Sequence, residues 1–139
     1  MPSSLPVLAA SVLLGALPFL ATAQTVPDTA PPAAPFQKVS ELVTLPDFLP
    51  GLGTLYVDPA TLPAGPFLGY DHDGKLSATI YMTPLEDLEG GQAFDDLALG
   101  RDSVASVDIY HNAGHPGVEK PHVHVVLYHD ADAKARLAE

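Results

Sequence analysis

Alternating apolar and polar residues predict a small β-sheet in the middle of the chain. Residues 75–82, Lys-Leu-Ser-Ala-Thr-Ile-Tyr-Met, alternate with the period of two that a strand requires. The face that we expect to be buried carries Leu76, Ala78, Ile80 and Met82. Residues 67–70 precede this strand across Asp-His-Asp-Gly, which predicts a hairpin with an Asp-Gly turn. Residues 54–58 are a further short candidate strand.

The pattern after residue 82 changes to that of short helices. Thr83-Pro-Leu-Glu86 carries an N-cap threonine, a proline at the first helical position and a glutamate three residues after the cap, which is a capping-box signature. The apolar face of this helical region would carry Leu85, Leu88, Phe94 and Leu97. Gly90-Gly91 would divide it into two short helices. A terminal helix is predicted from an Asp130 cap to Leu137.

A second hairpin is predicted near the end of the sequence. Residues 103–111 form a strand with Val107 and Ile109 directed inward, and residues 121–128 form its antiparallel partner. The nine residues 112–120 connect the two strands. Together the elements predict an α+β fold, a small antiparallel β-sheet with short helices packed on one side.

The first residues are typical of an export signal. Residues 1–23 contain an uncharged run from Leu5 to Leu20, followed by the small residues Ala21-Thr-Ala23 that a signal peptidase favours. Because the run is shorter than the roughly 20 apolar residues that span a bilayer, cleavage is favoured over an uncleaved membrane anchor. We therefore expect a periplasmic or secreted protein that begins at Gln24 after cleavage.

Two further segments are predicted after the signal. Residues 24–35 are rich in proline and alanine, which is typical of a mobile linker. Residues 36–139 would then form a single α+β domain, long enough to bury one modest core.

Charge and cysteine content exclude several classes of function. Six basic and 17 acidic residues give a formal net charge of −11. This charge opposes binding to nucleic acids and adsorption to anionic lipid, and it attracts cations. The chain contains no cysteine, so disulfides, thiolate ligands and thiol nucleophiles are excluded. A metal site would have to use histidine and carboxylate ligands.

Five of the six histidines fall between residues 111 and 129, and they are the main candidates for chemistry. His122 and His124 would project from the same face of a strand, about 7 Å apart along it. His115 lies on the connecting loop and His111 ends the preceding strand, so a hairpin could bring either of them close. We predict a metal site of His115, His122 and His124, with His111 as a fourth candidate, for a divalent transition metal such as Zn or Cu.

Other interpretations of the cluster stay open at this point. Isolated histidines in strands are more often surface residues or hydrogen-bonded core residues than metal ligands. Asp108 and Glu119 are candidate oxygen ligands or partners for an imidazole N–H. His129 lies an odd number of residues from His124, so it should face away from the cluster unless the strand bulges.

The same region resembles a motif in a family of small secreted bacterial proteins of uncharacterised function. The resemblance rests on Gly114-His-Pro-Gly-Val118, Pro121-His-Val-His124 and a closing Tyr128, and it extends to 63–70 and 81–85. It implies export and a β-rich fold, with no established activity. It carries over His115, His122 and position 124, where some relatives have Asp and this chain has His. A further histidine of the family is Val126 here, so the family's ligand set does not transfer unchanged.

A weaker resemblance is to the cupins, whose first motif contains a glycine followed by His-x-His. Gly117, His122 and His124 match this motif loosely, and Tyr128 stands where a carboxylate is expected. The second cupin motif would need more residues than follow Tyr128.

These observations lead to three hypotheses on function. The first is an exported, non-enzymatic domain that binds a metal ion or another small ligand through the histidine cluster. The second is a small cupin-like metal-dependent enzyme, which requires an open coordination position beside a cavity. The third is a structural or interaction module with the histidines as a pH-responsive patch.

Overall fold

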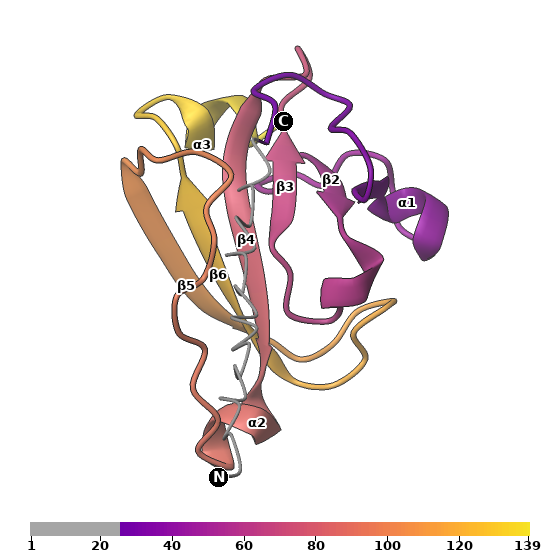
Figure 1. Cartoon of the computed structure of the whole chain (residues 1–139), viewed down its shortest axis with the longest axis vertical. Coiled ribbons are helices and arrows are strands. Elements are labelled where there is room, and N and C mark those ends of the chain that lie inside the picture. The colour runs from indigo at the N-terminus through magenta and orange to yellow at the C-terminus, as the bar shows by residue number, and fades with distance from the viewer. Residues whose placement is uncertain (1–25) are drawn as a thin grey trace, which may run out of the picture.

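The computed structural model describes residues 26–139 and contains a six-stranded antiparallel sheet with short helices (Figure 1). The predicted signal peptide, residues 1–23, lies outside the described residues. The strands are β1 (Gln37–Lys38), β2 (Thr54–Val57), β3 (Phe67–Tyr70), β4 (Leu76–Pro84), β5 (Ser106–Asn112) and β6 (His122–Tyr128). The helices are α1 (Val39–Leu42), the 3₁₀ turn η1 (Pro59–Thr61), α2 (Leu85–Glu89) and α3 (Ala133–Arg136).

The order of strands across the sheet is β1-β2-β3-β4-β6-β5, and each neighbouring pair is antiparallel. α1 and α3 pack on the same face, because Val39 of the first and Ala133 of the second belong to one hydrophobic core. α2 lies at the end of β4 (Figure 1). The predicted α+β fold, an antiparallel sheet with short helices, is confirmed.

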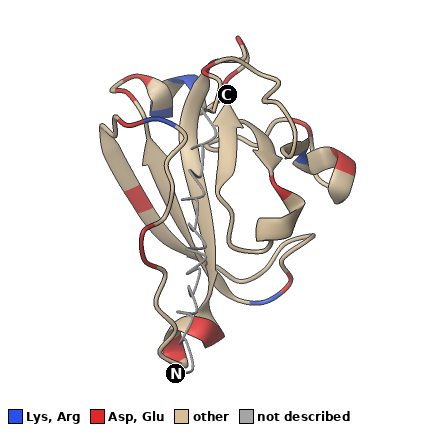
Figure 2. Ribbon diagram, in the orientation of Figure 1, with Lys and Arg blue, Asp and Glu red and all other residues tan. Residues whose placement is uncertain are grey.

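β4 is the central strand, and all of its residues are buried. One face contacts the main core, and segment 92–105 crosses the other, where the carbonyl of Ala98 accepts a hydrogen bond from the Tyr81 hydroxyl. β3, β4 and β6 contain no Lys, Arg, Asp or Glu, and the charged residues lie at the ends and edges of the sheet (Figure 2). An uncharged strand sequence is what burial on both faces requires.

The predicted central hairpin is confirmed, with one correction. β3 and β4 pair across a turn in which the Asp71 carbonyl accepts a hydrogen bond from the Gly74 N–H. Ala78, Ile80 and Met82 share the main core as predicted. Leu76 was expected beside them but packs with Leu68 and Tyr70 on the other face. The register shifts between Gly69 and Tyr70, where β3 pairs with the start of β4. Because of this irregularity, the side chain of Leu76 points to the opposite face from Ala78.

The second hairpin is confirmed as an antiparallel pair, but the predicted facing of its first strand is wrong. Val107 and Ile109 were expected inward, and they are 47% and 69% exposed. The register instead places Asp108, Tyr110 and Asn112 on the face of His122 and His124. β5 lies at one edge of the sheet, and its apolar residues Val107 and Ile109 are on the exposed face. The alternation of apolar residues therefore did not identify the covered face of this strand.

The predicted capping box does not form. β4 continues through Pro84, and the Thr83 hydroxyl donates to the Val123 carbonyl instead of capping a helix. α2 begins at Leu85 without a side-chain cap, and the second short helix predicted after Gly90-Gly91 is absent from the described chain. The ladder with β6 satisfies the backbone of these residues and so competes successfully with the local helix signal.

The part of the predicted linker that is described is docked on the sheet. The Ala30 N–H donates to the Gly74 carbonyl, and the Asp28 carbonyl accepts from the Leu76 N–H, both at 2.8 Å. Val26 and Ala30 also pack against the second hydrophobic cluster. A proline-rich composition therefore did not make residues 26–35 a free spacer. None of the helices formed by residues 26–139 has the length and apolar character needed to cross a membrane.

Candidate metal centre

His122 and His124 are fixed by the register of β6 between two other strands. They lie opposite Pro84 and Met82 of β4 on one side and opposite Asn112 and Tyr110 of β5 on the other. Alternate residues of β6 share a face, so both imidazoles point to the same side of the sheet. They are 0% and 3% exposed, which means that water contributes little to solvating either ring.

His115 reaches this pair from a tight turn in the loop between β5 and β6. Residues 115–118 form two backbone hydrogen bonds at 3.0 Å, each between His115 and Val118. Pro116 and Gly117 occupy the central positions, and Gly117 has φ +89°, the left-handed conformation that glycine adopts readily. Val118 is buried in the main core and anchors the turn. The Pro-Gly pair therefore builds the turn that presents His115.

The three imidazoles converge on one point. The Nε2 atom of His122 lies 2.8 Å from Nε2 of His124 and 3.2 Å from Nε2 of His115. One nitrogen from each ring lies within 4.8 Å of the other two. Ligand nitrogens bound to one zinc ion at about 2.1 Å are roughly 3.0–3.4 Å apart, depending on the coordination geometry. The arrangement can therefore hold one metal ion, with a small inward movement of His115, which is on the loop.

Backbone carbonyls fix the protonation of two of the three rings. Nδ1 of His122 lies 2.7 Å from the Lys120 carbonyl, and Nδ1 of His115 lies 3.0 Å from the Pro116 carbonyl. A carbonyl oxygen only accepts, so each Nδ1 must carry the proton and donate it. In a neutral ring this leaves Nε2 as an unprotonated lone pair. This is the arrangement in which metal-bound histidines donate their other N–H to a carbonyl.

Nε2 of His115 and Nε2 of His122 consequently face each other as two acceptors when the rings are neutral. Nε2 of His124 can carry a proton and donate it to Nε2 of His122. The contact between Nε2 of His122 and Nε2 of His115 would still join two lone pairs. A cation at the centre removes this conflict. Burial, together with His122 and His115 nearby, lowers the pKa of His124 to about 4, so this ring is neutral at neutral pH and available as a ligand.

Tyr110 contacts the cluster from β5. Its hydroxyl lies 3.1 Å from Nδ1 of His124, and the two rings are 5.0 Å apart between centroids. Burial, together with Asp108, raises the pKa of Tyr110, so the phenol stays protonated at neutral pH. The hydroxyl can either donate to Nδ1 or accept from it, and so permits the His124 tautomer that frees Nε2 for a metal.

The structure does not bring the other candidate ligands into this group. His111 pairs with Val123 in the register and therefore points to the opposite face, where it is exposed. His129 also lies away from the cluster, as its parity predicted. Asp108 forms an ion pair with Lys134, and Glu119 is exposed on the loop. Neither carboxylate belongs to the group that could hold a metal.

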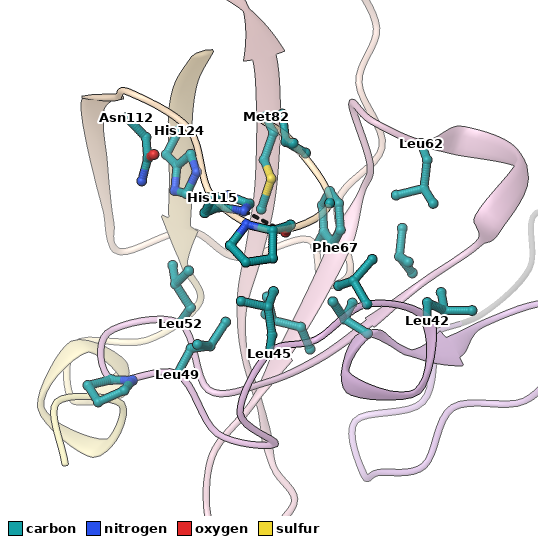
Figure 3. Close-up of a pocket in the computed structure, with 18 of the residues that line it drawn as sticks. Leu42, Leu45, Leu49, Leu52, Leu62, Phe67, Met82, Asn112, His115 and His124 are labelled. Carbon is teal, nitrogen blue, oxygen red and sulfur yellow. Dashed lines mark hydrogen bonds between the residues drawn. The ribbon is translucent and has the colours of Figure 1, made fainter. Parts of the chain in front are cut away.

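An apolar cavity of about 260 Å³ lies beside the histidines. His115, His124, Tyr110 and Asn112 contribute to its wall, and most of the remainder comes from leucines, valines and prolines. Figure 3 shows His115 and His124 at one side of the cavity and Leu42 and Leu62 at the other. The candidate metal centre therefore borders a space large enough for a small organic molecule.

Sequence reasoning missed this cavity and the role of Tyr110. The direction in which the β5 side chains point would have identified Tyr110. Tyr110 and Asn112 lie on the same face of β5, and Tyr110 is directly opposite His124. Many of the residues that line the cavity are apolar residues between 39 and 62. Because their spacing follows neither a helix nor a strand period, the sequence pattern did not reveal that they share one cavity.

The fold and the site define a predominantly β protein with a three-histidine candidate metal centre next to an apolar cavity. Among solved structures, the chain is similar to the hypothetical protein TTHB210 from Thermus thermophilus. The two are 41% identical, the similarity covers 68% of this chain and 94% of that chain, and the TM-score is 0.60. At this identity and coverage, the chain belongs to the same protein family as TTHB210.

No family model matches the chain, and no curated protein is significantly similar to it. The resemblances to a secreted bacterial family and to the cupins therefore stay predictions. The name of TTHB210 states no activity, so function must be inferred from the chemistry of the site.

Proposed function

We propose that this protein is an exported metal-binding domain in which His115, His122 and His124 bind one divalent transition metal ion through their Nε2 atoms. Zinc and copper suit three neutral imidazoles best. The observation that carries the proposal is the convergence of three Nε2 atoms, two of which are held as lone pairs by carbonyls that accept from Nδ1.

Three general properties of the chain support the proposal. The net charge of −11 raises the concentration of cations near the surface. Without cysteine, the protein has no thiolates that would compete with the histidines for a soft metal. The signal-like segment at residues 1–23 supports export to a compartment where such ions are encountered.

The experiment is a calorimetric titration of zinc and of copper into protein that carries no histidine tag. We expect one ion per chain, and no binding by the double variant His122→Ala/His124→Ala. The matched control is His111→Ala, which removes an exposed histidine from the same hairpin but from the opposite face. Absence of stoichiometric binding, or equal loss in the control, contradicts the proposal.

A second candidate function, a metal-dependent enzyme, is favoured by the cavity. Three protein ligands leave a coordination position open, and a catalytic metal needs such a position beside a space for substrate. His115 and His124 both line the cavity, so the open position can face it. Adding azide to the cobalt-loaded protein tests this: a change in the visible absorption means an exchangeable position, and an unchanged spectrum excludes this function.

A further inference from the structure

We infer that the cavity beside the histidines binds an amphipathic small molecule of about ten non-hydrogen atoms in all, with an apolar body that ends in one anionic oxygen donor to the metal. The inference rests on the proposed metal site and names its ligand class. A medium-chain carboxylate such as octanoate is the simplest molecule of this kind.

The size of the ligand follows from the cavity. A cavity of about 150 Å³ lined by Leu, Ile and Phe accepts benzene, which has six carbon atoms, so the 260 Å³ present here corresponds to about ten non-hydrogen atoms. Octanoate has this number of atoms, whereas acetate would leave most of the cavity unfilled.

The character of the body follows from the wall. α1, residues 43–52, β2 and β3 contribute almost entirely aliphatic and aromatic side chains. Within residues 26–139, no Lys, Arg, Asp or Glu lines the cavity. A polar or charged body would lose its hydration there without gaining a partner, so an apolar one is favoured.

The position of the polar head follows from the asymmetry of the wall. The groups that can coordinate a metal or donate a hydrogen bond belong to His115, His124, Tyr110 and Asn112. Figure 3 shows His115, His124 and Asn112 at one side of the cavity and the apolar Leu42 and Leu62 at the other, and Tyr110 contacts His124. Leu42, Leu62 and Tyr110 are 38%, 46% and 41% exposed, so the cavity reaches the surface on both sides. A ligand would therefore place its head at the histidines and its tail along the apolar wall toward Leu42 and Leu62.

The charge of the head follows from the metal site. Three neutral imidazoles leave the full charge of a divalent ion uncompensated, and an anionic oxygen in the open position reduces it. Without the metal the same anion would meet no cationic side chain in the wall, so its burial would be unfavourable. Ligand binding must therefore depend on the metal, and by linkage the ligand must tighten metal binding by the same factor.

The experiment measures octanoate binding to the full, tag-free chain by calorimetry, first with zinc bound and then after removal of zinc with a chelator. Two control ligands are titrated in the same way. Acetate has the carboxylate head of octanoate without its apolar chain, and 1-octanol has the apolar chain without the anionic head. We expect octanoate to bind zinc-loaded protein at least tenfold more tightly than either of these, and at least tenfold more tightly than it binds zinc-free protein. Zinc affinity should rise at least tenfold in saturating octanoate.

Two variants test that octanoate occupies the cavity. Leu45→Trp fills the space and should abolish octanoate binding while zinc still binds, and Leu42→Trp at the rim serves the same purpose if the first variant does not fold. The matched control Leu97→Trp changes a 42% exposed leucine outside the cavity and should have no effect.

The outcomes separate the two proposals. If zinc does not bind, both the proposed function and this inference fail. If zinc binds but octanoate binds no better than acetate, or is unaffected by filling the cavity, the inference fails and the metal site stands. Octanoate binding that is equally tight without zinc also overturns the inference, because the head would then not contact the metal.

Discussion

Two buried histidine environments at β6 differ in the partners that each ring finds. His129, which follows the strand, donates from Nδ1 to the Ser103 carbonyl and accepts at Nε2 from the Thr79 hydroxyl, both at 2.8 Å. Each of its nitrogens therefore has a partner of the right kind. His122 has a carbonyl at Nδ1, but at Nε2 it meets only two other ring nitrogens.

The comparison shows that burial by itself does not mark a functional histidine. His122 and His129 are 0% and 2% exposed. What differs is whether the neutral ring is satisfied by the protein alone. His129 is complete as a structural residue, whereas in the histidine cluster of His115, His122 and His124 the Nε2 atoms of His115 and His122 face each other as two acceptors.

The largest expected effect separates these two environments directly. His122→Ala should lower zinc affinity at least about 100-fold, since loss of a mere partner of a ligand already costs 10–100-fold. His129→Ala should leave zinc affinity within about twofold, because the ring does not contact the cluster. Calorimetric titration checks both variants, with circular dichroism to confirm folding. Equal losses in the two variants would remove the distinction between the environments.

Tyr110→Phe should have the next largest effect. It removes the hydroxyl from Nδ1 of His124, and we expect zinc affinity to fall about tenfold. Tyr56→Phe is the matched control, because Tyr56 packs against Tyr70 on the other face of the sheet. The same titration measures both. Unchanged affinity in Tyr110→Phe would mean that this hydroxyl does not orient the ring.

A glycine pair tests whether the turn at residues 115–118 positions His115. Gly117 and Gly91 both have positive φ, +89° and +85°, so alanine strains either backbone by about 1–2 kcal/mol. At Gly117 the new Cβ would also lie 3.0 Å from Cγ1 of Val43, whereas at Gly91 nothing lies within 4 Å.

We therefore expect both substitutions to lower the free energy of unfolding, which urea titration measures. Only Gly117→Ala should also weaken zinc binding, by about fivefold, or about 1 kcal/mol, because the turn that carries His115 must shift. A fivefold loss in Gly91→Ala as well would attribute the effect to general destabilisation.

The smallest effect concerns pH. Burial lowers the pKa of His129; Arg101 lowers it further, while Ser103, Asp130 and Asp28 act in the opposite direction. The unfolded chain therefore binds a proton at this residue before the folded protein does. The stability contributed by neutral His129 is present above the ordinary pKa of about 6.5 and declines as pH falls below it.

His129→Gln, which keeps a polar side chain but does not titrate, should reduce this decline. Urea unfolding at pH 5 and pH 7 in the presence of a chelator measures it. A pH dependence identical to that of the unsubstituted protein would show that His129 does not contribute.

The sequence predicted the site more accurately than the details of the fold around it. His122 and His124 followed from strand parity, and the same parity correctly separated His129. His111 stayed open as a fourth ligand, because only the register between β5 and β6, which pairs it with Val123, places it on the opposite face. The facing of β5 was wrong because Val107 and Ile109 are apolar yet lie on the exposed face of an edge strand.

Features set by distant contacts were beyond the reach of local patterns. Thr83 has every local property of a helix cap, but pairing with β6 keeps it in a strand. Prolines between residues 27 and 35 suggested a free spacer, but backbone hydrogen bonds to residues 74 and 76 hold this segment on the sheet. The tautomers of His115 and His122 depend on two carbonyls whose positions only the folded chain defines.

The most direct test of the account is a crystal structure of the zinc-loaded protein with the anomalous signal of zinc. The account predicts one ion bound at about 2.0–2.1 Å by the Nε2 atoms of His115, His122 and His124, with the Nδ1 contacts to Lys120 and Pro116 retained. No zinc peak within reach of these three atoms, in a crystal that contains zinc, would contradict it.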